Sequence, residues 1–469
     1  MRPDRFREQF DAMNEGARER GRPLAYDPER FFTWEKGCLL AREGEDAEVV
    51  AATIDRLELT RRGETRNERS GIRALRFGDP FRDGDNADED VRRVLGELPR
   101  RGGELGPYAT RNHIVSVTEV NGCPNDEPEP VSTIAPAALN PGLAAARGNG
   151  SVRVLVVDTG LVAGVTETYP WLRDVVTDDE LEPDFGPLAQ YVGHGTFIAA
   201  VLKAVAPDAA VEVDDAIPAI MAAAVPEDVF GEALLEVLDD KGWPPILSLS
   251  AGAVTEDDRA LLGLKTFMER LAQEPTVLVC SAGNNGRDEP FYPAYHAKSM
   301  PGKVIAVGAL RADGQGRACF SNHGEWVTVY APGERISSVF TAADHTPPLY
   351  VYRHSTFEEC RFTHQPPYAD CSCVTPRIDG ERSLARDGNA AGIAATRKAF
   401  TGLARWSGTS FSTPIVAGMI VNQMLESGED DPVVAAQHLL AKQAVAIGGG
   451  GSGTTLTPPT WRPLPYGPA

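Results

Sequence analysis

The sequence is short of cysteine, of positive charge and of long apolar runs. Its seven cysteines are an odd number in a chain of 469 residues, which is not the pattern of a secreted disulfide framework. No apolar stretch is long enough for a membrane-spanning helix. The charged stretch from Met1 to Glu8 also lacks the apolar core of a secretory signal. We therefore expect a cytoplasmic protein with reduced thiols.

The shortage of positive charge bears on the partners. The 46 lysines and arginines are outnumbered by 67 aspartates and glutamates, which gives a net charge of −21. This charge disfavours nucleic acid and anionic membrane surfaces as partners. The hydrophobic content of 42% and the charged content of 24% are typical of a soluble globular protein. The length suffices for two or three domains with a large core.

Residues 1–123 predict a small α/β module. The order of its elements is strand, helix, strand, helix, strand, because alternating apolar positions indicate strands and apolar positions three and four apart indicate helices. Pro- and Gly-rich residues 124–150 then predict an exposed linker. The strands are predicted at 38–41, 72–77 and 113–120, and the helices at 46–57 and 88–98.

Residues 151–446 predict a larger α/β domain. The apolar, β-branched run Val152–Val157 is typical of a strand buried in a parallel sheet. Strands and helices alternate after it, which predicts a parallel sheet with helices on both faces. An insertion at 341–405, rich in Pro, Cys, His, Arg and Asp, interrupts this order. The Gly- and Pro-rich tail, 447–469, predicts disorder.

Four polar residues stand among small residues at the ends of predicted elements. Asp158 follows the first strand of the larger sheet, and His194 begins an apolar helix. Asn284 follows another strand, and Ser410 lies in the turn 407–414 before a long apolar helix. Functional groups of open α/β sheets gather at the carboxyl ends of strands, so these side chains are expected to meet. Taken singly, each has an ordinary explanation as a turn, cap or loop residue.

The four stretches resemble the subtilisin-like serine peptidases, the subtilases. The match includes the chain order Asp, His, Ser. It also includes the connecting pieces 206–209 and 330–333, and it covers roughly residues 150–340 and 405–425. The family's usual His-Gly-Thr-His is here His194-Gly195-Thr196-Phe197. The missing second histidine is not the catalytic one.

The resemblance implies a serine endopeptidase. A serine hydroxyl is a poor nucleophile that needs an adjacent base, which assigns Ser410 as nucleophile and His194 as general base and then acid. Asp158 would orient the imidazole and stabilise its charged form. Asn284 would donate to the oxyanion of the tetrahedral intermediate, together with the Ser410 backbone N–H.

The resemblance also places the contacts with substrate. An extended peptide would pair with the edge formed by Ser250, Ala251 and Gly252. Ala282 and Gly283 would form the other wall of the pocket for the residue before the scissile bond. Phe291 stands where the family has the pocket floor, so it would shorten the pocket and favour small side chains. In the alternative interpretation, Phe291 turns into the core.

No cofactor is required by this chemistry, but two clusters suggest metals. Cys360, His364, Cys371 and Cys373 in the insertion carry zinc-ligand chemistry, although their spacing matches no standard pair of ligand knuckles. We favour a loop with reduced or disulfide-paired cysteines. The acidic run 174–184 is a candidate for calcium, which many subtilases bind. A solvated surface is the favoured interpretation, because the spacing matches no specific loop.

The N-terminal module has two interpretations. Subtilases commonly begin with a small α/β propeptide that is cut away, and self-cleavage near 124–150 would support that. The module could instead stay attached and recruit a regulatory protein. Two other functions therefore stay open: a processing or defence peptidase activated by a partner through the module, and a binding protein that keeps the fold without catalysis.

Overall fold

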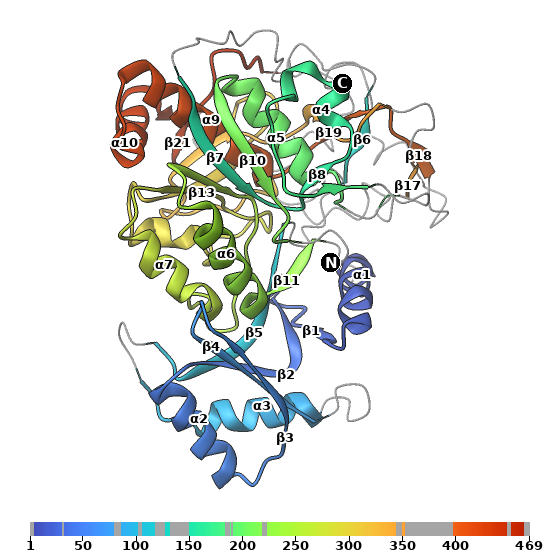
Figure 1. Cartoon of the computed structure of the whole chain (residues 1–469), viewed down its shortest axis with the longest axis vertical. Coiled ribbons are helices and arrows are strands. Elements are labelled where there is room, and N and C mark those ends of the chain that lie inside the picture. The colour runs from blue at the N-terminus through green and yellow to red at the C-terminus, as the bar shows by residue number, and fades with distance from the viewer. Residues whose placement is uncertain are drawn as a thin grey trace.

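Figure 1 shows two bodies along the long axis of the molecule, a small module (residues 4–117) and a larger body (residues 127–463). Helix α1 (Asp4–Glu19) lies at the side, near the junction of the two. The computed structural model describes residues 4–30, 32–78, 86–101, 106–117, 127–131, 150–182, 188, 191–217, 223–343, 349–351, 397–447 and 452–463.

The module is an antiparallel sheet with two helices packed against it. Helices α2 (Glu45–Arg56) and α3 (Asn86–Glu97) bury apolar side chains against the strand order β5–β2–β4–β3, and β1 pairs with β2. Burial of such a face is the main stabilising term for so small a unit. The strands are β1 (Leu24–Tyr26), β2 (Thr33–Arg42), β3 (Arg61–Asn67), β4 (Ile72–Phe77) and β5 (Ala109–Ser116).

The predicted helices and strands of the module are present, but their order differs. An additional strand, β3, precedes β4, so the order from β2 onward is strand, helix, strand, strand, helix, strand. β3 was missed because its residues are polar and almost all exposed, which leaves no apolar alternation to detect. β5 also begins and ends four residues earlier than predicted.

The larger body confirms the predicted parallel sheet with helices on both faces. The strand order is β10–β7–β12–β13–β14–β15–β21–β20, parallel except between β20 and β21. Its long strands are β7 (Val152–Val157), β10 (Ala209–Asp214), β12 (Ile246–Leu249), β13 (Val277–Ser281), β14 (Val304–Leu310) and β15 (Val329–Pro332).

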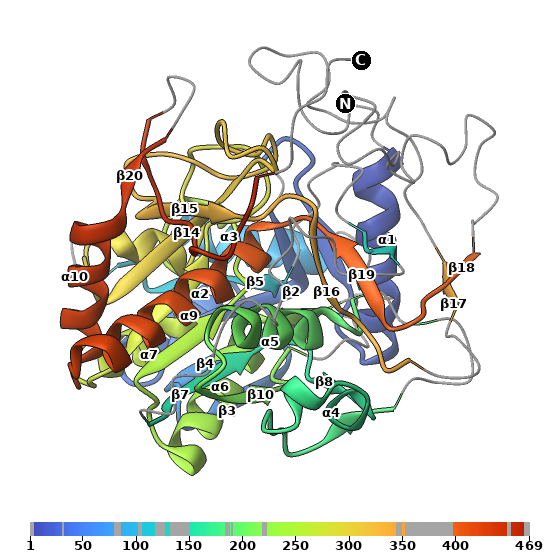
Figure 2. The same cartoon turned by 90° about the horizontal axis from the view of Figure 1, so that it is seen from above.

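Two helices on one face of this sheet matter for the site. Helix α9 (Thr409–Ser427) lies across the central strands and packs against α5 (His194–Val205), as Figure 2 shows. α9 is apolar on all sides and buried from Thr409 to Val421 because sheet and helix cover it. Helices α6 (Glu227–Lys241) and α7 (Lys265–Leu271) lie between the parallel sheet and the module (Figure 1). α10 (Pro432–Gln443) packs against α9.

Two segments predicted as an exposed linker and a disordered tail are partly built into the larger body. In the predicted linker, β6 (Glu129–Pro130) pairs with β19 (Leu403–Trp406), and the Glu129 side chain is buried. In the predicted tail, β21 (Thr454–Thr455) pairs with β15, and Leu456 is buried. Two-residue strands carry no periodic signal, so composition alone suggested loops.

The two metal candidates have different outcomes. All four cysteine and histidine positions of the zinc candidate lie outside the described residues. In the acidic run, Asp174 lies 2.7 Å from the Lys203 ammonium and Asp178 lies 2.7 Å from that of Lys241. Within the described ranges, no group of three or more His, Cys, Asp or Glu side chains is arranged to hold a metal ion.

No helix in the described part of the chain is long and apolar enough to cross a membrane.

Candidate active site

Asp158 and His194 form a buried pair at the carboxyl end of the sheet. Asp158 follows β7 and His194 is the first residue of α5; both side chains are 0% exposed. Nδ1 of His194 lies 2.7 Å from Oδ1 of Asp158. Since a carboxylate can only accept, Nδ1 carries the proton. Nε2 is then the basic nitrogen, and it has no hydrogen-bond partner among the described residues.

A glycine allows the two segments to approach. A Cβ atom at Gly195 would lie 2.5 Å from the backbone oxygen of Gly160, in the turn after Asp158. Any side chain there would push α5 away and lengthen the Asp158–His194 contact. The histidine ring is enclosed by Trp406 and Phe411, with ring centroids 5.3 Å and 5.4 Å away. These aromatic rings exclude water from the pair and strengthen its electrostatic interaction.

Ser410 sits in the first turn of α9. The turn is anchored by the Gly408 N–H, which donates to the Gly333 carbonyl at 2.8 Å. The Ser250 hydroxyl donates to the Ser410 carbonyl at 2.9 Å, so Ser250 supports the serine turn. The free backbone N–H groups of a helix N-terminus favour negative charge nearby. Ser410 therefore lies in the positive potential of a helix N-terminus.

The side chain of Asn284 is fixed beside the serine turn. Its Oδ1 accepts from both the backbone N–H and the hydroxyl of Thr409, each at 2.9 Å. Because both donors hold the oxygen, the amide NH₂ group faces away from Thr409. The orientation leaves two N–H donors for another acceptor. All four residues singled out from the sequence thus lie at one edge of the sheet.

The cleft beside Ser410 is occupied by the last strand of the module. Ser116 of β5 exchanges two backbone hydrogen bonds with Gly252, each 3.0 Å long. On its other side β5 pairs with β11 (Ala224–Pro226), and the Val117 N–H donates to the Ala223 carbonyl at 3.0 Å. The peptide is therefore held as a strand between two edges, as substrates bind by strand addition.

The nucleophile candidate touches this peptide. The Ser410 hydroxyl lies 3.2 Å from the carbonyl oxygen of Val117 and donates to it. Of the predicted edge, Gly252 makes the peptide contacts, whereas β11 was not identified from the sequence. Its only signal was the apolar run before the acidic start of α6, with Pro226 at the boundary.

Phe291 lies between the two predicted walls of the side-chain pocket. A Cβ atom at Gly252 would lie 2.5 Å from Cε1 of the Phe291 ring, and one at Gly283 would lie 3.0 Å from Cγ. The ring is 2% exposed, and Ala251 and Ala282 beside it are buried. The ring thus fills the space between the walls, next to Gly252, which pairs with Ser116 at the end of β5.

Buried charges hold the module at the first turn of α6. Asp228 accepts from Arg22 at 2.6 Å and from Asn112 at 2.8 Å, both of the module. Arg22 also bonds Glu35 at 2.7 Å. Burial by itself raises the pKa of Glu35, but the guanidiniums of Arg22 and Arg76 outweigh it and hold the pKa of that carboxyl below its ordinary value.

A neighbouring carboxylate bonds the strand in the cleft. Glu227 accepts from the backbone N–H of His113 at 3.0 Å and lies 2.8 Å from its ring Nδ1. Both acidic residues start a helix, where the N-terminal dipole favours negative charge. The module is therefore joined to the larger body by desolvated, fully bonded charges as well as by β5.

Comparison with known families agrees with this arrangement. The model of the subtilase family, Peptidase_S8, matches residues 148–453, which is more than half of the chain. The chain belongs to the subtilase family. The match covers all four residues described above and leaves out the module.

Two curated relatives of this subtilase illustrate the range of similarity. It is 30% identical over 204 residues to a thermophilic serine proteinase of Bacillus sp. (strain AK1), a match that covers 42% of this chain and 47% of the relative. It is 28% identical over 264 residues to subtilisin BL of Lederbergia lenta, covering 54% and 82%. The chain spans about half the length of the first curated relatives it matches.

Among solved structures, fervidolysin from Fervidobacterium pennivorans, a keratinolytic enzyme related to subtilisin, has a similar fold. It is 18% identical, with a TM-score of 0.50, and the likeness covers 92% of this chain and 62% of that one. Such coverage includes most of the module as well as the larger body. At this identity the likeness concerns the fold alone.

Proposed function

We propose that this subtilase is a serine endopeptidase that uses Ser410, His194, Asp158 and Asn284. The observation that carries the proposal is the contact between the Ser410 hydroxyl and a peptide carbonyl, next to a buried Asp–His pair whose Nε2 has no partner among the described residues. A nucleophile, a base, an orienting carboxylate and an amide donor around one peptide bond are the parts that acyl transfer needs.

The mechanism starts with a turn of the Ser410 hydroxyl from the Val117 carbonyl toward Nε2 of His194. The imidazole accepts the proton as Oγ attacks the carbonyl carbon. Asp158, bonded to Nδ1, stabilises the resulting imidazolium. The Asn284 amide and the Ser410 N–H donate to the oxyanion, and His194 then gives the proton to the leaving amine. Water repeats the sequence to release the acyl group from Ser410.

The burial of Asp158 and His194 argues against a binding protein that has lost catalysis. Taking ionisable groups out of water costs free energy, and apolar side chains of similar size are often as stable or more so. A protein that only binds has no need of such a pair, whereas general-base catalysis does. The proposed peptidase therefore accounts for both side chains and the binding protein for neither.

We further propose that residues 4–117 act as a propeptide and inhibitor. The strand β5 lies in the cleft with Val117 at Ser410, so the bond from Val117 to Thr118 is the one that the enzyme would cut in itself. This position precedes the range 124–150 expected from the sequence. Because the module fills the cleft, it must leave before another substrate binds, which favours control by a partner that displaces it.

Labelling with a fluorophosphonate probe tests the proposed chemistry. The probe should modify Ser410 in the wild-type protein, and only in molecules from which the module has left after the cut, because β5 otherwise covers the serine. His194→Ala removes the base and should abolish the labelling while the protein stays folded. Mass spectrometry of the labelled peptide gives the site. Modification of a different serine, or none after complete removal of the module, would refute the assignment.

Phe291 should set the preference for the residue before the cut. In a peptide library the wild type should prefer small or β-branched residues such as valine there. Phe291→Ala should raise kcat/KM for phenylalanine over valine by roughly 10- to 200-fold, as expected when a pocket gains space. Phe267→Ala, which removes a buried ring in α7, is the control and should leave the ratio unchanged. An unchanged ratio in Phe291→Ala would contradict the shallow pocket.

A further inference from the structure

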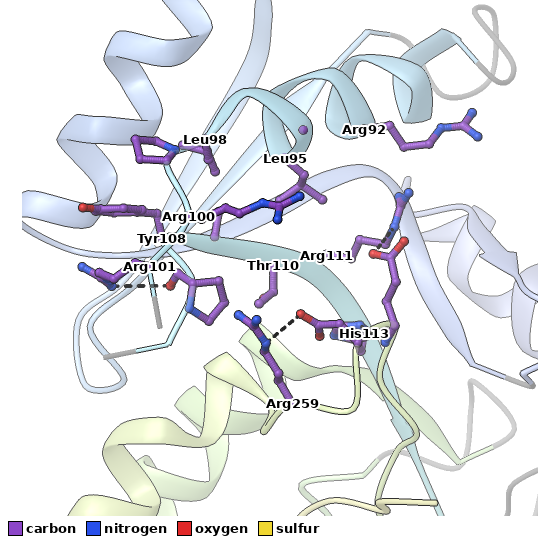
Figure 3. A pocket seen from close by; sticks show the side chains of 16 residues that line it. Arg92, Leu95, Leu98, Arg100, Arg101, Tyr108, Thr110, Arg111, His113 and Arg259 are labelled. Carbon is purple, nitrogen blue, oxygen red and sulfur yellow. Dashed lines mark hydrogen bonds and ion pairs between the residues drawn. The ribbon is translucent and has the colours of Figure 1, made fainter. Parts of the chain in front are cut away.

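A cavity of about 710 Å³ lies where the module meets the larger body, away from the Ser410 cleft. Its walls come from α3, from residues 98–101, from the start of β5 and from the loop 256–259 of the larger body (Figure 3). Sites for small molecules usually measure roughly 300–1,000 Å³ and combine an apolar wall with a few polar groups. This cavity has both features.

Arginine dominates the polar wall. Arg101 and Arg111 are held in place by the carboxylates of Asp46 and Asp88, at 2.7 Å and 3.0 Å. Arg259 lies 3.1 Å from Asp257, and half of its side chain is exposed. Arg100 is exposed and has no ion-pair partner among the described residues. Carboxylates balance the charges of Arg101, Arg111 and Arg259, so the uncompensated positive charge of this wall lies at Arg100.

Two carboxylates on the rim are already engaged. Glu256 bonds Nε of Arg111 at 2.9 Å, and Asp257 bonds Arg259. They lower the positive potential, but the guanidinium of Arg100 has no anionic partner among the residues that the structure describes. Leu95, Leu98 and Tyr108 give the cavity an apolar wall beside Arg100 and Arg101.

Thr110 gives a second, independent sign of a ligand. Its side chain on β5 is 8% exposed and points into the cavity in Figure 3. Its hydroxyl oxygen is buried and has no hydrogen-bond partner in the part of the chain that the structure describes. A buried hydroxyl without a partner costs free energy, so it is typical of a position where a bound molecule supplies the bond.

We propose that this cavity binds a small organic anion, in which a phosphate or carboxylate group meets Arg100 and Arg259 and an apolar body lies on Leu95 and Leu98. Guanidinium groups match both anions through paired hydrogen bonds. Arg100 belongs to the module and Arg259 to the larger body, so the ligand contacts both. It binds the docked form only and stabilises docking.

Calorimetric titration of the full-length Ser410→Ala chain tests the binding without any need for catalysis. Phenyl phosphate should bind with a dissociation constant below about 1 mM. Arg100→Ala and Arg259→Ala should each weaken it about tenfold, since each removes charge-assisted hydrogen bonds. Arg56→Ala removes an exposed arginine of α2 and should change nothing. No measurable binding, or equal binding to the Arg100→Ala and Arg56→Ala variants, overturns the site.

Two further probes separate the parts of the ligand. Inorganic phosphate should bind more weakly than phenyl phosphate, and equal affinity would overturn the role of the apolar wall. Benzyl alcohol, which lacks the charge, should not compete with phenyl phosphate, and competition would overturn the role of the arginines. Benzoate tests whether a carboxylate serves as well as a phosphate.

The effect on docking rests on the proposed function and has its own readout. In the wild-type protein, phenyl phosphate should lengthen the lag before hydrolysis of an added peptide. The lag should grow by the factor by which the ligand raises the equilibrium constant for docking of the module. In Arg100→Ala the same lengthening should need about tenfold more phenyl phosphate. Binding to Ser410→Ala without any change of the lag would overturn the regulatory role and leave the site itself standing. Absence of hydrolysis altogether would count against the proposed peptidase alone.

Discussion

Ser410→Ala is expected to yield one uncut chain of 469 residues, whereas the wild type yields two polypeptides, the second beginning at Thr118. Oγ is the atom that contacts the Val117 carbonyl, and no other described hydroxyl bonds that oxygen. In subtilisin, loss of the nucleophile lowers kcat by about 10⁶, and we expect a loss of that order here. Intact mass spectrometry and hydrolysis of an added peptide measure the two effects.

The matched control is Ser412→Ala, in the same turn. The Ser412 hydroxyl donates to the Ala331 carbonyl at 3.0 Å and therefore supports the turn without reaching the peptide. This variant should still cut itself at the same bond, with some loss of stability. Cleavage of Ser410→Ala after Val117 would show that another group performs the reaction. A wild-type cut within 124–150 would show that the peptide at Ser410 is an inhibitor and not the first substrate.

Asp228→Ala is expected to destabilise the docked position of the module by about 3–5 kcal/mol. This is the usual cost of removing one partner of a buried ion pair. The change takes a buried acceptor from Arg22 and Asn112 and leaves the Arg22 guanidinium paired with Glu35 alone. In the uncut Ser410→Ala background, hydrogen exchange at the β5 amides should accelerate by roughly two to four orders of magnitude, the equivalent of that free energy.

Glu236→Ala serves as the comparison on the same helix. Glu236 lies 3.4 Å from Arg69 of the module, but both side chains are exposed, and such surface pairs contribute less than about 1 kcal/mol. Exchange at β5 should hardly change. Equal protection of β5 in Asp228→Ala and Glu236→Ala would mean that backbone pairing with β11 and Gly252, and not the buried charges, holds the module.

The sequence predicted the four site residues because each follows or begins a strongly apolar element. The run 152–157 marks a buried strand and thus places Asp158 at its end, and the helix after Ser410 is apolar on all sides. These signals are local, and parallel strands bring their ends to one edge of the sheet. Nothing in them depends on the position of the module.

The contacts between the module and the larger body are different in kind. Glu227 and Asp228 look like the ordinary acidic first turn of a helix, and only the fold shows that module side chains surround them. The pairing of β5 with β11 joins residues about a hundred positions apart, which no periodic pattern reveals. The cytoplasmic location and the zinc candidate stay predictions.

One strand, β5, belongs to the module sheet and to the cleft at the same time, and this has a kinetic consequence. The peptide reaches Ser410 as part of the same molecule, so its local concentration is fixed by the chain and not by the amount of protein. The half-time of the first cut should then be the same at any dilution. After the cut, rebinding of the module to the larger body is a bimolecular step. Dilution therefore favours the separated pieces and the open cleft. In a concentrated stock the protein would be cut but inactive, and the same protein would gain activity when diluted.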